Sequence, residues 1–413
     1  MQHAQSHARS WRWIGRGALA AAAGLIAFGV SPALPALAGT WSAPVQLPGS
    51  CGGSVAVNQA GAMAAGGTFT AADGTTHVQV CTSANGKTWQ ATDLGQGGNA
   101  PRSGQRVAVA VTPGGEAVAL WGYEACSTCV PVVEAAARPA GGSWGAPVTL
   151  DTGLDLSPGG LTIGVDGSGN VIAVWVVSPG DVIDSVLPAG SGSWGPDTTL
   201  ELENNQGPAH GISLAVSPAG DAIVTFNGGL NNVWAISGTV TGGFSAPVEI
   251  ALGFGNNDYH LTGVTRVALN NAGQASIAWS VTGHTGVATR SPAGAWSAPT
   301  ILSTASFSSA STAIDGAGDA IAVFGSSYSW HLAGGGWGTP APLPSGSSGG
   351  LAVADPAGAF VFASTAGSAF TVTAGATSFG AGSAAPGSLA ALAIVPGHAV
   401  VLAADAVSTE PVS

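Results

Sequence analysis

"RPAGGSWGAPVTL", residues 138–150, returns as "RSPAGAWSAPTIL", residues 290–302, with nearly the same residues in the same order. The shared elements are a Gly-containing turn, an aromatic residue, a Pro and a short apolar run. Six further copies, some of them less well matched, centre on Trp41, Trp89, Trp194, Phe244, Trp337 and Phe379. Eight copies of one phrase predict eight copies of one structural unit.

A second phrase alternates with the first, as in "VAVTPGGEAVALW" and "IGVDGSGNVIAVW". Its turn glycines are 39 to 54 residues apart, at Gly61, Gly115, Gly169, Gly220, Gly273, Gly318, Gly358 and Gly397. Such a period is typical of propellers and of helical solenoids. Asp, Asn, Pro and Gly between apolar runs of period two indicate β-hairpins, and therefore the propeller.

Two side-chain positions predict how these hairpins pack. In five units an aromatic residue lies six positions after the turn glycine: Trp121, Trp175, Phe226, Trp279 and Phe324. The even spacing places all five on one sheet face, against a neighbouring sheet.

In the first phrase a Pro lies three positions after the aromatic, at Pro44, Pro147, Pro247, Pro299 and Pro340. Because Pro cannot donate a ladder hydrogen bond, we place it in an outermost strand. Each unit is then a four-stranded antiparallel blade of an all-β propeller, with strands A to D from inside to outside.

The two ends of the repeat array predict how the ring closes. Residues 41–47 form an isolated strand D, and residues 389–404 an eighth A–B hairpin. We expect the N-terminal strand to complete the last blade. The count gives eight blades, with seven as the alternative because residues 406–413 leave little chain for strand C.

The N-terminal segment has the features of an export signal. Arginines at positions 9, 12 and 16 precede an apolar run over 17–30, and Ala36-Leu37-Ala38 supplies small residues for cleavage. We assign residues 1–38 to a signal peptide and 39–413 to one propeller domain, secreted to the extracellular space or periplasm and not inserted in a membrane. In that compartment Cys51, Cys81, Cys126 and Cys129 are disulfide candidates, with three pairings open.

The composition excludes several classes of partner. Charged residues are only 7% of the chain, and the formal net charge is −12. Too few Lys and Arg are present to form a basic patch for nucleic acid. No zinc-protease, nucleophile-elbow or phosphate-loop motif occurs, so we expect no cofactor or metal. The segments "DGSGN" (166–170) and "DGAGD" (315–319) are interpreted as turns rather than calcium loops.

One stretch resembles a known family. "TSANGKTW", residues 82–89, is similar to the Asp-box of sialidase-like propellers, with Thr82, Gly86, Thr88 and Trp89 matching and Ala84 in the place of the Asp. The resemblance implies a propeller fold. The arginine clamp and paired catalytic residues of sialidases are not visible, so no catalytic residue is assigned.

Propeller ligands bind where variable loops are held by rigid blades, here the D–A linkers and B–C loops. All three tyrosines fall in these segments by the predicted scheme, along with several polar residues. The predicted ligand-binding residues are Arg102, Arg106, Tyr123, Glu124, Asp258, Tyr259, His260 and Tyr328. Aromatic faces and hydrogen-bonding side chains suit glycans. We therefore expect a non-catalytic binding or adhesion module for glycans or an extracellular protein. An extracellular glycoside hydrolase or lyase, and a surface scaffold without a ligand site, remain the alternatives.

Overall fold

The turn glycines lie where the sequence places them, between antiparallel strands. Their φ angles run from 73° to 103° in Gly61, Gly115, Gly169, Gly220, Gly273, Gly318 and Gly358. Only glycine adopts this left-handed backbone without strain. In the turn at 166–170, the amides of Ser168 and Asn170 both donate to Asp166 Oδ1 at 2.9 Å. Asp315 accepts the equivalent two amides in its own turn. Both Asp–Gly segments are therefore hydrogen-bonded turns, as predicted.

The computed structural model describes residues 41–411 except for short segments, and this described part of the chain contains no helix. It accordingly has no helix long and apolar enough to cross a membrane. Residues 36–413 cluster as one unit. Outside the description lie 1–40, 97–106, 125–130, 153–155, 178–179, 202–208, 229–231, 252–263, 282, 306, 308–309, 345–346, 366–367, 377–378, 381–382, 385–388, 396–397, 404–405 and 412–413.

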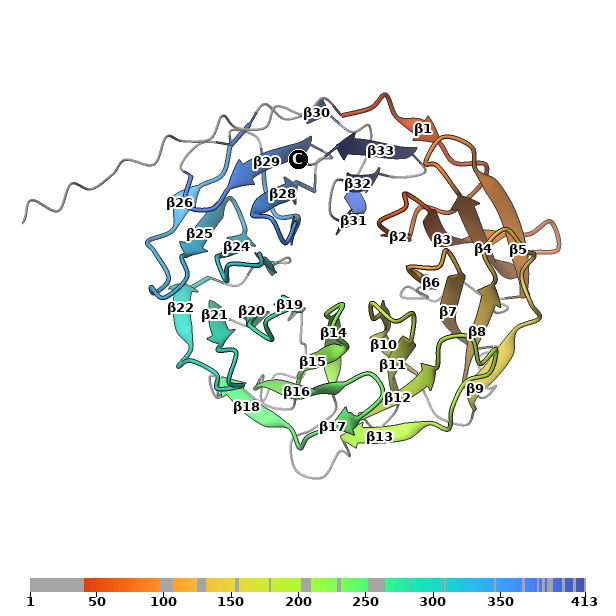
Figure 1. Cartoon of the computed structure of the whole chain (residues 1–413), viewed down its shortest axis with the longest axis horizontal. Coiled ribbons are helices and arrows are strands. Elements are labelled where there is room, and N and C mark those ends of the chain that lie inside the picture. Colours follow the sequence, from red (N-terminus) through yellow and green to blue (C-terminus); the bar gives the residue numbers. More distant parts are fainter. Residues whose placement is uncertain are drawn as a thin grey trace, which may run out of the picture. The chain divides into compact units, whose positions relative to one another are not determined.

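The strands form eight separate antiparallel sheets arranged around a centre (Figure 1). Blade 1 consists of β2 (Ser54–Val57), β3 (Met63–Thr70), β4 (Thr76–Ser83) and β5 (Gln90–Gln96). Blade 2 consists of β6 (Val107–Val111), β7 (Ala117–Glu124), β8 (Pro131–Arg138) and β9 (Val148–Thr152). Blade 3 consists of β10 (Leu156–Val165), β11 (Val171–Val177), β12 (Asp181–Leu187) and β13 (Thr198–Glu201). Blade 4 consists of β14 (His210–Val216), β15 (Asp221–Asn227), β16 (Val233–Thr239) and an outer strand divided into β17 (Gly243–Phe244) and β18 (Val248–Ala251).

The second half of the ring follows the same order from inner to outer strand. Blade 5 consists of β19 (Val264–Leu269), β20 (Ala275–Val281), β21 (His284–Arg290) and β22 (Thr300–Ser303). Blade 6 consists of β23 (Ala310–Ile314), β24 (Ala320–Phe324), β25 (Ser327–His331) and β26 (Ala341–Pro342). Blade 7 consists of β27 (Leu351–Ala354), β28 (Ala359–Ala363), β29 (Ser368–Thr373) and β30 (Ser383–Ala384). Blade 8 consists of β31 (Leu389–Val395), β32 (His398–Ala403), β33 (Ala406–Pro411) and β1 (Val45–Gln46).

Blade 8 joins the two ends of the described chain. β1 pairs with β33, with Val45 opposite Val407 and Gln46 opposite Ala406. The amide of Ser42 also donates to the carbonyl of Thr409 at 2.8 Å. The predicted closure and the count of eight blades are confirmed. The short C-terminal segment forms strand C of this blade as β33.

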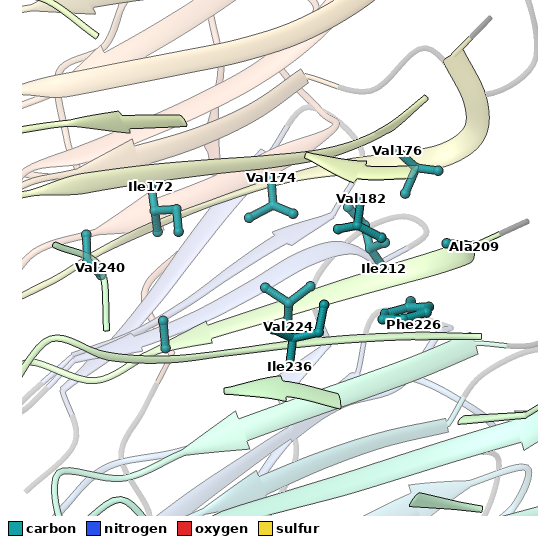
Figure 2. Packing of buried hydrophobic residues seen from close by; sticks show 11 residues of the cluster. Ile172, Val174, Val176, Val182, Ala209, Ile212, Val224, Phe226, Ile236 and Val240 are labelled. Atoms are coloured by element: carbon teal, nitrogen blue, oxygen red, sulfur yellow. The ribbon is translucent and has the colours of Figure 1, made fainter. Parts of the chain in front are cut away.

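The predicted aromatic residues fill the spaces between blades. Trp121, Trp175, Phe226, Trp279 and Phe324 are at most 3% exposed, and each packs against the preceding blade. Figure 2 shows this between blades 3 and 4, where Val174 and Val176 face Val224 and Phe226. The blades are thus held together by the apolar sheet faces that the period-two pattern of the sequence predicts.

The repeated prolines lie just before the outer strands rather than inside them. Pro147 precedes Val148, the first residue of β9, and Pro299 precedes Thr300, the first residue of β22. The outermost position is confirmed, but each Pro lies one residue before the first residue of the outer strand, because a residue without an N–H cannot donate a ladder hydrogen bond. Strand C is also contacted before the Pro. Gly145 donates to the carbonyl of Ala137, and Ser297 to that of Thr289, at 2.9 and 2.8 Å.

The stretch that resembles an Asp-box forms a turn capped by a different residue. Asn85, one position after Ala84, accepts hydrogen bonds from the amides of Lys87 and Thr88 at 2.9 and 3.0 Å. Gly86 has a φ of 69°, and Trp89 Nε1 donates to its carbonyl. The turn is therefore made without an aspartate.

Two faces of the ring follow from the strand order. The turn face carries the A–B turns and C–D hairpins, and the loop face carries the B–C turns and D–A linkers. Of these, the loop face is the one predicted to bind the ligand.

Candidate functional site

The inner strands surround a central cavity of about 870 Å³. Its walls come mainly from Gly, Ala, Ser, Thr and branched apolar residues of β2, β6, β10, β27 and β31. Arg266 of β19 is the one charged side chain among these lining residues. A cavity of this size is within the range of about 300–1,000 Å³ typical of small-molecule sites.

A disulfide fixes the linker that forms one wall of this cavity. Cys51 and Cys81 are bonded across 30 residues and are both fully buried. The bond ties the segment before β2, whose Ser50 and Gly53 line the cavity, to the third strand of blade 1. Ser50 also donates its amide to Gln79 Oε1 at 2.7 Å. The Cys51–Cys81 bond is thus established and fits one of the three predicted pairings, while Cys126 and Cys129 lie outside the described residues.

Tyr123 and Glu134 meet on the face of blade 2 that packs against blade 1. Trp121 pairs with Glu134 across β7 and β8, so Trp121, Tyr123 and Glu134 project from the same face of the sheet. The Tyr123 hydroxyl donates to Glu134 Oε1 at 3.5 Å. Both side chains are half-buried, and Tyr123 packs on the apolar cluster shared by blades 1 and 2. The pair therefore combines an aromatic face, a hydroxyl and a carboxylate close to the B–C turn of blade 2.

Partial burial shifts the proton affinity of both groups. Burial raises the pKa of Glu134 above its ordinary value, and the Tyr123 hydroxyl bond opposes this rise. Burial also raises the pKa of Tyr123, and the negative charge of Glu134 raises it further. A neutral phenol beside a partly desolvated carboxylate presents one donor and several acceptors to a ligand that carries hydroxyl groups.

Tyr328 lies elsewhere and in a different environment from the one predicted. Like Tyr123, which belongs to β7, it lies in a strand (β25) and not in a loop, and it is 4% exposed. Its ring packs edge-on against Phe379 at 5.0 Å within the core between blades 6 and 7. Blades 2 and 6 lie on opposite sides of the ring, so Tyr328 does not join Tyr123 (Figure 1).

The remaining predicted residues fall outside what the structure describes. Glu124 is the last residue of β7, but its side chain is not described. Arg102, Arg106, Asp258, Tyr259 and His260 lie in the linkers 97–106 and 252–263. Their role at a ligand site stays a prediction.

Glu134 is the site residue that sequence reasoning missed. It is the one acidic residue in the apolar segment "PVVEAAA", residues 131–137. A charged residue inside such a strand has to be placed next to a polar partner or an opening. That signal marks Glu134 as a candidate, but its meeting with Tyr123 depends on the register of β7 against β8. No cluster of three His, Cys, Asp or Glu side chains able to hold a metal ion occurs in the described part of the chain.

Comparisons with known proteins bear on the fold. No protein-family model and no curated protein sequence matches this chain. The structure is similar to the BP39L lectin from Burkholderia pseudomallei, with a TM-score of 0.55 and 15% identity, over 81% of this chain and 99% of the lectin. It is also similar to BamB from Moraxella catarrhalis, with a TM-score of 0.53 and 14% identity, over 90% of this chain and 99% of BamB.

The chain is an eight-bladed β-propeller. At these identities the likeness shows the fold alone, because one fold hosts many functions. Neither similar structure is a sialidase, so the Asp-box resemblance gains no support from them.

Proposed function

We propose that this β-propeller is an exported binding module that recognises a glycan through its loop face, at a site that includes Tyr123 and Glu134. The observation that carries the proposal is the half-buried pair itself, which offers an aromatic ring, a hydroxyl and a carboxylate beside the B–C turn of blade 2. Sugar rings present an apolar face and a rim of hydroxyls, and this combination of groups complements both.

Export is the second part of the proposal. The signal-like segment over residues 1–38 supports it. The buried Cys51–Cys81 disulfide supports it too, because such bonds form and persist in oxidising compartments. N-terminal sequencing of the protein recovered from the culture medium or periplasm should give a chain that begins at residue 39.

A glycan array with the exported chain tests the binding activity. Tyr123→Phe removes only the hydroxyl, and Glu134→Gln removes only the charge. Either variant should weaken binding to the array ligands by about tenfold, as expected for the loss of a hydrogen bond to a charged group. Tyr328→Phe is the matched control, since it makes the same change in a core tyrosine. Tyr259→Ala extends the test to the linker at 252–263.

Three results would count against the proposal. Absence of binding to every glycan would remove it, and capture of a protein from the same environment would then favour a protein partner. Equal losses in Tyr123→Phe and Tyr328→Phe would show a general effect on folding rather than a site. Unchanged binding by both loop-face variants would place the glycan elsewhere.

A further inference from the structure

A second cavity, of about 320 Å³, lies between blades 1 and 2 at the turn face. Blade 1 contributes residues of the C–D hairpin that resembles an Asp-box, among them Thr82 and Gln90. Blade 2 contributes Arg138, the turn glycine Gly115 and the hairpin residues 140–141. The volume suits a small ligand, and the cavity is on the opposite face from the site proposed above.

The strand register turns the polar side chains of both blades toward each other. Arg138 pairs with Ala117, which packs in the apolar cluster shared by blades 1 and 2, so Arg138 projects from the face of blade 2 that is turned toward blade 1. In blade 1, Thr82 pairs with Ala64 of β3 and with Gln90 of β5. Because Ala64 belongs to the same cluster, Thr82 and Gln90 project toward blade 2.

The two arginines of the repeated phrase differ in what they bind. Arg290 pairs with Ala275, and its Nη1 donates to the carbonyl of Gly273 at 2.8 Å within its own blade. Arg138 occupies the same strand position, is half-buried, and forms no hydrogen bond or ion pair with any described residue. All N–H donors of its guanidinium are therefore unused. Since partial burial weakens screening by water, they would bind the acceptors of a ligand more strongly than an exposed arginine would.

The charges around the cavity favour an anion. The residues that line it include no Asp or Glu, and Arg138 is the one charged residue among them. Lys87 is exposed in the same blade 1 hairpin, between Asn85 and Thr88, which both line the cavity. Two of the four Lys and Arg residues that the structure describes are thus at this place, in a chain of formal net charge −12. One guanidinium inside the cavity matches a single negative charge.

The other polar groups extend the set of donors. Thr82 and Thr88 have hydroxyls, and Asn85 and Gln90 have side-chain amides. We propose that this cavity binds a small ligand through a singly charged oxyanion, either a carboxylate or a sulfate ester. Arg138 donates two parallel N–H bonds to two oxygens of the group, and the hydroxyl of Thr82 donates to the same group.

Four probes that share one sugar ring separate the effect of the charge from that of the rest of the ligand. Glucuronate and glucose 6-sulfate carry one negative charge, glucose 6-phosphate carries about two, and glucose carries none. In isothermal titration calorimetry, at least one singly charged probe should bind about tenfold or more tightly than glucose and glucose 6-phosphate. Added NaCl should weaken this binding.

Variants then assign the binding to the cavity. Arg138→Gln should lower the affinity for the bound probe about tenfold or more, and Arg138→Lys, which keeps the charge but loses the planar fork, should lower it less. Thr82→Val keeps the shape and removes the hydroxyl, and should lower the affinity about threefold or more. Arg290→Gln is the matched control and should leave it unchanged. Tyr123→Phe and Glu134→Gln should also leave it unchanged, so that the two proposed sites can fail separately.

Several outcomes would overturn the proposal. One is the absence of binding by both singly charged probes, and another is equally tight binding of glucose. Tighter binding of glucose 6-phosphate would reject the single charge. With thermal unfolding showing an intact fold, unchanged affinity in Arg138→Gln, or equal losses in Arg138→Gln and Arg290→Gln, would reject the cavity as the site. If Arg138→Gln does not fold, unchanged affinity in both Arg138→Lys and Thr82→Val rejects it.

Discussion

The turn face and the loop face of this propeller are built in different ways from the same strands. In the first seven blades, strands A and B are joined across four or five residues, with a glycine at positive φ near the end. The linkers between blades vary from 3 to 12 residues and share no phrase. Repetition on one face leaves the opposite face free to vary. The comparison teaches that local turn chemistry specifies the ring, whereas the ligand specificity is expected in segments that do not repeat.

The turn face is also joined from blade to blade by hydrogen bonds. Asn58 Nδ2 donates to the carbonyl of Thr112 at 2.9 Å, and Asn270 Nδ2 to that of Asp315 at 2.8 Å. The amide of Gly316 in blade 6 donates to the carbonyl of Pro356 in blade 7 at 3.1 Å. On the loop face, one linker is instead tied covalently, by the Cys51–Cys81 bond.

The largest expected effect is the loss of that covalent tie. Replacing both Cys51 and Cys81 by Ala should lower the free energy of unfolding by about 3 kcal/mol, since the bond constrains a segment of 30 residues. Guanidinium unfolding of the wild-type protein and of the double variant measures the difference. Reduction of the wild-type protein should reproduce the loss. A difference below about 1 kcal/mol would mean that the loop face does not depend on the bond.

A methyl group added to the turn face should have the next largest effect. A Cβ at Gly316 would lie 2.4 Å from the carbonyl oxygen of Pro356, and relief of this clash would break the bond between the two blades. We expect Gly316→Ala to lower the unfolding free energy by about 2 kcal/mol.

Gly336, in the C–D hairpin of the same blade, is the matched control. Nothing lies within 4 Å of a Cβ added there. Thermal or guanidinium unfolding of Gly336→Ala should therefore match the wild-type protein within about 0.5 kcal/mol. Equal losses in the two variants would show that the blade-to-blade contact on the turn face is unimportant.

The sequence was sufficient for the turn face and the core, because both depend on local patterns. Trp175 and Phe226 follow their turn glycines by an even number of residues, and strand geometry alone then determines their face. Tyr328 was misplaced because Gly325 and Ser326 form a two-residue turn, so strand C begins earlier than expected. The meeting of Tyr123 with Glu134 depends on the register of β7 against β8, which no local pattern specifies.

Asp184 is a buried carboxyl group that lies at neither face, and replacing it tests how a buried charge affects stability. It is 6% exposed in β12 of blade 3, its Oδ1 has no hydrogen-bond partner, and burial raises its pKa from 3.8 to about 6. Since the folded state binds this proton more tightly than the unfolded chain, the contribution of Asp184 to the free energy of unfolding is most favourable below pH 4. This contribution falls as the pH rises to about 6 and is constant above. Asp184→Asn should therefore be more stable by about 1 to 2 kcal/mol at pH 7 to 8, with no gain at pH 3.5. Urea unfolding across this pH range measures the gain. A gain that is the same at every pH would assign the effect to something other than ionisation.

The smallest expected effect on stability is at the proposed loop-face site, and its sign is opposite to that on the turn face. Burial raises the pKa of Glu134, so the ionised carboxylate destabilises the folded protein at neutral pH. Glu134→Gln should raise the unfolding free energy by less than about 1 kcal/mol at pH 7, because the side chain is only half-buried and solvent screens it. The same change should weaken glycan binding. A ligand group that opposes stability while it serves binding is what a functional site predicts, whereas Gly316 on the turn face supports the packing of two blades. Paired measurements of chemical unfolding and glycan affinity on this one variant decide the matter: a loss of stability together with unchanged affinity would make Glu134 an ordinary structural residue of blade 2.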